Sequence, residues 1–143
     1  MKTQELKIEA PKGFEIDTEK STFERIVFKE VSDKFDKVLA YHNTTKENFE
    51  KLYLNIPKHV KAYEKEAMLA AFYNKGWIPN FQESSEIKHY PWFYLDEFRL
   101  YDVNCSSNDS GVPARLVWKN EEDLKEAIEL YPNVFKESRE FNQ

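Results

Sequence analysis

The order and periodicity of the apolar residues predict an α+β protein, in which an antiparallel sheet of about four strands packs against about four helices. Strand-like stretches occur near the start of the chain and again in its second half, and helix-like stretches fill the middle and the C-terminal part. This order differs from the strict strand–helix alternation of a parallel sheet. The length of 143 residues, with no internal repeat and no linker-like segment, predicts a single domain over residues 1–143.

The first two strands are expected over residues 6–10 and 22–30. In the first segment, LKIEA, apolar and charged residues alternate, which is typical of a half-buried strand. The second segment is rich in β-branched and aromatic residues and contains the run Ile26-Val27-Phe28. We therefore expect both faces of the second strand to be covered near its centre.

Three helices are predicted next: the first follows a Ser32 or Asp33 cap and includes residues 35–42, the second follows Thr44 and Thr45 and runs to residue 56, and the third covers residues 58–74. In the first two, apolar side chains recur at positions i, i+3, i+4 and i+7, which gives each helix one apolar stripe. Pro57 ends the second helix and suits the first turn of the third. Residues 67–73 are apolar nearly all round, so this half of the third helix should be the most buried part of the molecule.

A hairpin is predicted in the second half of the chain. Residues 97–105 and 113–119 have strand-like composition, and they flank a polar loop. In the first strand the apolar residues do not keep to one face, so either both faces are covered or a bulge near residue 100 switches the face. In the second strand Trp118 shares a face with Leu116, which places it in the core.

The final helix is predicted to begin after Asn120, a good cap, and to carry three acidic residues in its positive first turn. Leu124, Ala127 and Ile128 lie on its apolar stripe. Pro132 ends this helix, and residues 133–138 are expected to add one short turn.

Composition and charge exclude several classes of function. No apolar run approaches the roughly 18 residues of a membrane span, and the first residues lack the apolar stretch of a secretory signal. We therefore expect a cytoplasmic protein without membrane contact. The net charge is −5, whereas nucleic-acid-binding proteins usually carry a basic stripe. The charge makes nucleic acid a less favoured partner, without excluding it.

Residues for catalysis or metal binding are sparse. The three glycines lie far apart in the sequence, so no phosphate-binding loop is predicted. No two of the histidines His42, His59 and His89 have the spacing that one helix would need for a metal site, and Cys105 is the only cysteine. We therefore predict no catalytic residue, no metal and no cofactor, and we expect that the protein is not an enzyme. A small hydrolase ranks third among the possible functions.

The most informative stretch is KHYPWFYLDEFRLYDV, residues 88–103, which has six aromatic side chains in sixteen positions. In one interpretation these aromatic residues close the core. In the other, some of them line a shallow groove that binds a protein segment or a single-stranded nucleic acid. Core closure is favoured for part of the stretch, but alternate side chains of a strand face opposite sides, so some must be exposed. The candidate binding surface comprises Lys88, Tyr90, Trp92, Tyr94, Arg99 and Arg115.

Three segments carry a resemblance to a known family. They are GFEIDTEKSTFERIVFK at 13–29, GWIPNF followed by YPWF within 76–93, and RLVWKNEEDLKEA at 115–127. They resemble the recurring motifs of small uncharacterised proteins from phage and mobile-element regions of Bacteroides-type bacteria. The resemblance covers most of the chain.

This sequence departs from the family pattern at two places. Asn80-Phe81 replaces an Asp-Trp pair, and Trp118 replaces a phenylalanine. The family brings no established activity, so the resemblance implies a phage-type setting and transfers no catalytic residue. We expect a non-enzymatic accessory protein that binds a host or phage protein, and the alternative is a single-stranded nucleic-acid-binding protein that uses residues 88–103.

Overall fold

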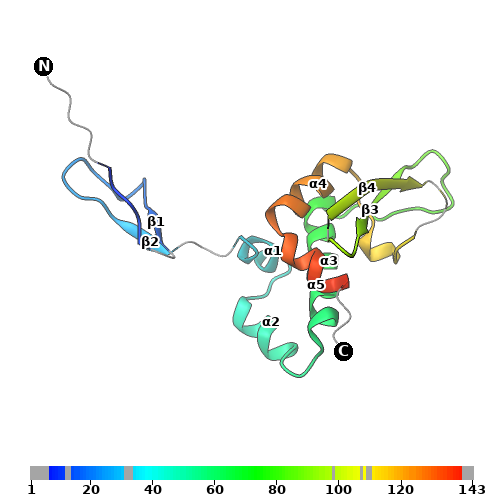
Figure 1. Ribbon diagram of the computed structural model, residues 1–143, viewed down its shortest axis with the longest axis horizontal. Coiled ribbons are helices and arrows are strands. Elements are labelled where there is room, and N and C mark those ends of the chain that lie inside the picture. Colours follow the sequence, from blue (N-terminus) through cyan, green and yellow to red (C-terminus); the bar gives the residue numbers. More distant parts are fainter. Residues whose placement is uncertain are drawn as a thin grey trace, which may run out of the picture. The chain divides into compact units, whose positions relative to one another are not determined.

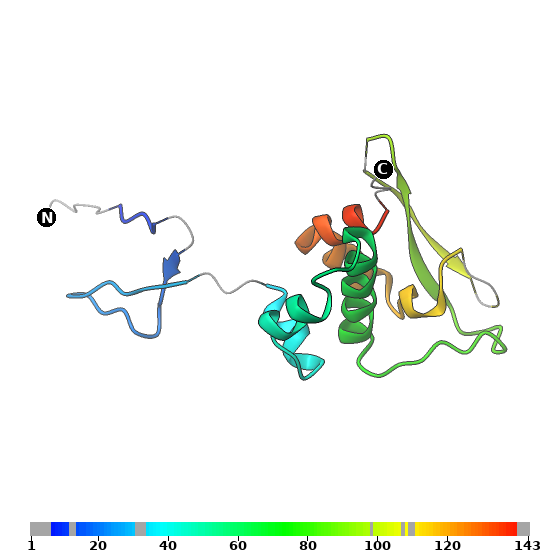
Figure 2. The same ribbon diagram turned by 90° about the horizontal axis from the view of Figure 1, so that it is seen from below.

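A computed structural model of the chain describes residues 7–11, 14–30, 34–97, 99–106, 108 and 111–139 (Figures 1 and 2). Its helices and short antiparallel strands confirm the α+β class. The chain divides into two compact units, Met1–Asp33 and Lys34–Gln143. The single domain expected over residues 1–143 stays a prediction.

The first unit contains a small hairpin. Strand β1 (Phe14–Ile16) pairs antiparallel with β2 (Phe28–Glu30). The connection is held by Asp17, which is buried and accepts the backbone N–H groups of Glu19 and Lys20 with one carboxylate oxygen, each at 3.1 Å. This is the local capping that Asp side chains provide in turns.

Both strands predicted for this unit need correction. The described residues 7–10 of the first predicted strand are exposed and form no strand, and residue 6 lies outside the described residues. The second predicted strand, 22–30, is reduced to its last three residues. The reason is local: the Ser21 hydroxyl accepts the N–H of Val27 at 2.9 Å, and Thr22 and Arg25 bond to each other through their backbones. These bonds use groups that a longer ladder would need.

The second unit contains five α-helices within the described residues. They are α1 (Asp36–Tyr41), α2 (Lys46–Leu52), α3 (Lys58–Asn74), α4 (Glu121–Leu130) and α5 (Pro132–Arg139). The helix α2 begins directly after Thr45, as the sequence predicted, and the Thr45 hydroxyl caps it by accepting the N–H of Asn48 at 3.3 Å. The C-terminal segment forms a full helix, α5, where only a single turn was predicted. In both views α1 and α2 lie on one side of α3 (Figures 1 and 2).

A second antiparallel pair lies on the other side of α3. It consists of β3 (Lys88–Tyr94) and β4 (Arg99–Ser106). The predicted hairpin between 97–105 and 113–119 is therefore wrong, because 97–105 pairs with the preceding aromatic segment. The alternative of a bulge near residue 100 is confirmed: the partners of Trp92 and Phe93 are Asp102 and Leu100, so residue 101 is the extra residue.

Residues 113–119 form no strand. Pro113 precedes a short 3-10 helix, η1 (Ala114–Leu116), and Trp118 then forms a single antiparallel bridge with His89 through two backbone hydrogen bonds of 2.8 and 2.9 Å. The four named strands thus form two separate two-stranded sheets and not the single sheet of about four strands that the sequence predicted.

The core of the second unit contains buried side chains from all five helices and from the β3–β4 sheet. The side chain of Trp118 is fully buried, with its ring centroid 5.5 Å from that of Tyr73 and 6.3 Å from that of Phe135. This confirms the core position predicted for Trp118, although the surrounding segment is not a strand. In α3, residues 67–70 are buried as the sequence predicted, whereas Ala71 is exposed and Phe72 and Tyr73 are only half-buried.

Replacing Trp118 with alanine should lower the free energy of unfolding of the second unit by about 3–5 kcal/mol, because a fully buried indole leaves a cavity. Urea unfolding followed by circular dichroism measures the loss. Trp92→Ala, at an exposed tryptophan, is the matched control and should cost less than about 1 kcal/mol. A loss below about 1 kcal/mol for Trp118→Ala would contradict the position described for Trp118.

Candidate functional site

One face of the β3–β4 sheet carries most of the aromatic residues that the sequence singled out. Tyr90, Trp92 and Tyr94 alternate along β3 and share this face. On β4, Asp102 lies opposite Trp92 and Arg99 lies opposite Tyr94. We call these five residues the hairpin face. Tyr90 is half-buried on this face, whereas Trp92 is 53% exposed and Tyr94 is 37% exposed.

The other face of β3 closes the core. Pro91 and Phe93 are buried, and the ring centroid of Phe93 lies 6.1 Å from that of Phe135 on α5. Core closure is therefore confirmed for Phe93, whereas Trp92 and Tyr94 are exposed, and the binding role given to the exposed residues stays a prediction. Alternation along one strand sends Phe93 inward and Trp92 and Tyr94 outward.

At its far end the hairpin face has a cation stacked on a ring. The guanidinium of Arg99 lies over the ring of Tyr94, 4.1 Å from its centroid, and its Nε donates to Glu97 at 2.8 Å. Cation–π contacts of this kind hold both side chains in place at a modest energy. The result is a preformed aromatic surface next to Leu95, which is 62% exposed.

The free edge of this sheet is less suited to binding. Within the described residues, β4 pairs only with β3. The backbone N–H of Val103 donates to the Asp102 carboxylate at 2.8 Å, so an added strand could not use it without breaking that bond. Recognition by the side chains of the hairpin face is therefore favoured over strand addition.

Lys88 does not lie on the surface that the sequence predicted. Its side chain is fully buried, and its ammonium donates to the backbone carbonyls of Asn80, Glu86 and Glu83 at 2.5, 2.8 and 3.2 Å. The ring of Phe81 lies 5.2 Å from the nitrogen. A buried ammonium needs such partners. Lys88 therefore organises the segment 77–87 and is not available to bind a ligand.

Glu86 completes the organisation of the same segment. One carboxylate oxygen accepts the backbone N–H of Asn80 at 2.6 Å, and the other accepts the indole N–H of Trp77 at 3.3 Å. Hydrogen bonds to the charged carboxylate, chiefly the one from Asn80, hold the pKa of Glu86 below its usual value. The ionised form of Glu86 therefore stabilises the contacts with Asn80 and Trp77.

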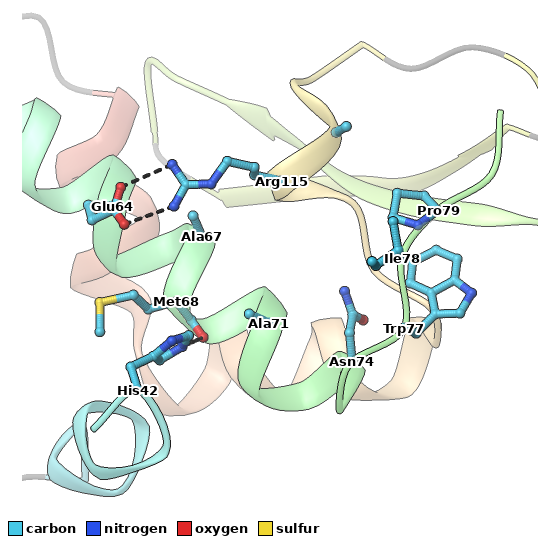
Figure 3. Close-up of a pocket in the computed structure, with 11 residues that line it drawn as sticks. His42, Glu64, Ala67, Met68, Ala71, Asn74, Trp77, Ile78, Pro79 and Arg115 are labelled. Carbon is cyan, nitrogen blue, oxygen red and sulfur yellow. Dashed lines mark hydrogen bonds and ion pairs between the residues drawn. The ribbon is translucent and has the colours of Figure 1, made fainter. Parts of the chain in front are cut away.

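Arg115 lies on a different surface, facing α3. Its two terminal nitrogens donate to the two carboxylate oxygens of Glu64 at 2.8 and 3.2 Å (Figure 3). This bidentate ion pair raises the pKa of Arg115, with the hydrogen bonds to Glu64 as the main cause. The structure therefore brings Tyr90, Trp92, Tyr94 and Arg99 together and leaves Lys88 and Arg115 out of that face.

The surface that Arg115 borders is a pocket of about 330 Å³ on α3. Figure 3 shows Ala67 and Ala71 along α3, with His42 and Met68 on one side and Trp77, Ile78 and Pro79 on the other. The Nε2 of His42 lies 2.9 Å from the carbonyl oxygen of Met68, so this nitrogen carries the hydrogen and donates it. Apolar side chains line most of the pocket.

Two shallower depressions extend the pocket at its ends. One, of about 210 Å³, shares His42, Glu64 and Met68 with it and continues to Leu52 on α2. The other, of about 410 Å³, shares Asn74 and Trp77 and carries three charged residues at its rim: Lys75, Lys119 and Asp123. We call the three depressions together the α3 groove.

The sequence did not predict this groove. The sequence indicated that residues 67–73 are apolar nearly all round and therefore buried. The one local signal for a hollow on α3 is the small size of Ala67 and Ala71, which lie one helical turn apart on the same face. The groove also depends on residues 77–79 and 114–115, which belong to segments without regular periodicity. Their position follows from tertiary contacts that no local pattern encodes.

Among the described residues, no group of three or more His, Cys, Asp or Glu side chains lies close enough to hold a metal ion. Every helix there is too short or too polar to traverse a lipid bilayer. No family model, curated protein or solved structure matches the chain.

The Glu86 contacts predict a pH response of the segment 77–87. Because the folded pKa of Glu86 lies below its unfolded value of about 4.3, the stabilisation is present above that value and is lost as the pH falls through the folded pKa. The indole N–H resonance of Trp77 should therefore shift with an apparent pKa below about 4.3 in an NMR titration.

Glu86→Gln should abolish this shift, and Glu97→Gln, at an exposed glutamate of the hairpin turn, should leave it unchanged. A Trp77 transition at or above a pH of about 4.3 would contradict the assignment to Glu86.

Proposed function

We propose that this chain is a non-enzymatic accessory protein that binds another protein through the hairpin face. The main support for this proposal is a group of exposed apolar side chains towards the hairpin turn. Trp92 is 53% exposed, Tyr94 is 37% exposed and the adjoining Leu95 is 62% exposed. Trp, Tyr and Arg dominate the residues that contribute most to protein interfaces. The resemblance of the sequence to phage and mobile-element proteins supports a host or phage protein as the partner.

The shape of this surface also supports a protein partner. A shallow pocket of about 280 Å³ adjoins Trp92 and Leu95 and is bordered by Gly111 and Arg139. A Cβ atom on Gly111 would lie 3.1 Å from the ring of Tyr90, so glycine lets that loop approach the ring closely. An exposed aromatic residue beside a small pocket suits mutual insertion of side chains, which is typical of protein interfaces.

Binding of single-stranded nucleic acid is the second candidate. It is supported by the exposed ring of Trp92 and by Arg99 stacked on Tyr94, since bases stack on such groups. The charge opposes it, because Arg99 is paired with Glu97 and Asp102 lies opposite Trp92. This face therefore lacks the cationic excess that phosphate binding needs.

Trp92→Ala tests the proposal in a capture experiment. The tagged full chain is incubated with a lysate of a phage-bearing Bacteroides-type host, and bound proteins are quantified by mass spectrometry. A specific partner should lose at least about tenfold in recovery with Trp92→Ala, because truncating an interface tryptophan removes a large share of the affinity.

Leu54→Ala is the matched control, because Leu54 is 77% exposed in another part of the second unit, and it should leave recovery unchanged. Equal recovery of every protein by both variants would contradict the proposal. So would micromolar binding of a labelled single-stranded oligonucleotide near 0.15 M salt, because the acidic surroundings should repel phosphate at roughly this ionic strength.

A further inference from the structure

We propose that the α3 groove is a second binding site, separate from the hairpin face, and that it receives a short amphipathic helix with acidic residues from a protein partner. The proposal does not depend on the function of the hairpin face. It stands on the length of the groove, on the small residues along its floor and on the charges at its rim.

The length of the groove suits a short helix. Its floor runs along α3 from Glu64 to Asn74, and ten residues of helix correspond to roughly 15 Å, or about three turns. The adjoining depressions share Glu64 and Asn74 with it, and the Asn74 amide, bonded to the backbone of Val117 and Lys119, lies between the central pocket and the charged depression. An elongated site of this kind fits the row of apolar anchors on one helix face better than a single compact molecule.

Small side chains allow the backbone of a bound helix to approach closely. Ala67 and Ala71 form the floor, and Ala114 lies on the opposite wall beside Arg115. The walls are apolar and accessible at both ends: Ile78 is 82% exposed and Leu52 is 73% exposed. Two apolar side chains spaced i and i+4 on a partner helix would fill the central pocket and the Leu52 depression.

The ion pair at the rim has unused hydrogen-bonding capacity. A guanidinium has five N–H donors, and Arg115 directs two of them to Glu64. The other donors of Arg115 have no acceptor among the described residues. An acidic side chain of a partner can accept them while Glu64 stays in place, because the donors of the planar fork point in different directions.

The charges along the groove favour an acidic occupant. Three cationic side chains, Lys75, Lys119 and Arg115, face two carboxylates, Glu64 and Asp123, which gives +1 in a chain whose net charge is −5. Within the part of the chain that the structure describes, neither Lys75 nor Lys119 forms an ion pair. Both lie at the Asn74 end, so the acidic residues of the bound helix should lie at that end.

A nucleic acid is a weaker match. Its phosphates would meet Glu64 and Asp123 as well as the cations, so the groove lacks the strong cationic excess that phosphate binding needs. An amphipathic acidic helix satisfies both the apolar floor and the cationic end.

The test is a selection from a random dodecapeptide display library against the full chain, followed by fluorescence anisotropy with the enriched peptides. Ala71→Glu places a charged side chain on the exposed floor of the groove. Ala40→Glu makes the same change at an exposed alanine of α1, outside the groove, and is the matched control. Thermal unfolding shows that each variant is folded.

Enriched peptides should combine two apolar residues three or four positions apart with acidic residues. Their affinity should fall at least about tenfold with Ala71→Glu and change less than about twofold with Ala40→Glu and Trp92→Ala. Lys119→Gln should weaken binding about threefold and reduce its salt dependence, whereas Lys37→Gln on α1 should not.

Three results would overturn the proposal: no enrichment, enriched peptides without acidic residues, or equal effects of Ala71→Glu and Ala40→Glu. Binding of a labelled single-stranded oligonucleotide that is lost with Ala71→Glu would also overturn it, in favour of a nucleic-acid site.

Discussion

Arg139, at the end of α5, holds its guanidinium between two other elements. It donates to both carboxylate oxygens of Glu66 on α3, at 2.7 and 3.0 Å, and lies 4.7 Å from the ring centroid of Phe93 on β3. The Ser138 hydroxyl adds a 2.7 Å bond to Glu66, whose side chain is fully buried. Because a buried carboxylate without partners is strongly unfavourable, α5 must stay on α3, and the stacked Phe93 keeps β3 against both. The floor of the α3 groove and the hairpin face are thereby held in one framework.

Patterns within single elements predicted much of the second unit. The 3.6-residue spacing identified α1 to α4 to within a few residues, and the apolar run in α3 indicated its burial. Strand pairing was predicted less well, because a strand's partner depends on residues far away in the sequence. Pro91 lies within β3 although proline lacks the backbone N–H of a ladder bond. The neighbouring His89 directs its backbone groups away from β4, and by alternation Pro91 does the same, so no ladder bond is lost.

The candidate site was predictable in part for the same reason. Alternation along a strand predicted that some aromatic residues of 88–103 are exposed, and Trp92 and Tyr94 are. Lys88 and Arg115 were assigned to that surface because of their charge alone. In the structure Lys88 instead donates to three backbone carbonyls, and Arg115 pairs with Glu64. The α3 groove and the Glu66–Arg139 pair each join residues that are distant in the sequence, and no local signal identifies such contacts.

A double-mutant cycle on Glu66 and Arg139 tests this framework most directly. Arg139→Met should lower the free energy of unfolding by about 3–5 kcal/mol, since it leaves the Glu66 carboxylate buried without its cation. Glu66→Met combined with Arg139→Met should be less destabilising than Arg139→Met alone, because the combined change removes both charges. Arg99→Met, in the exposed pair with Glu97, should cost at most about 1 kcal/mol. Urea unfolding that shows additive effects, or a loss below about 1 kcal/mol for Arg139→Met, would contradict the account.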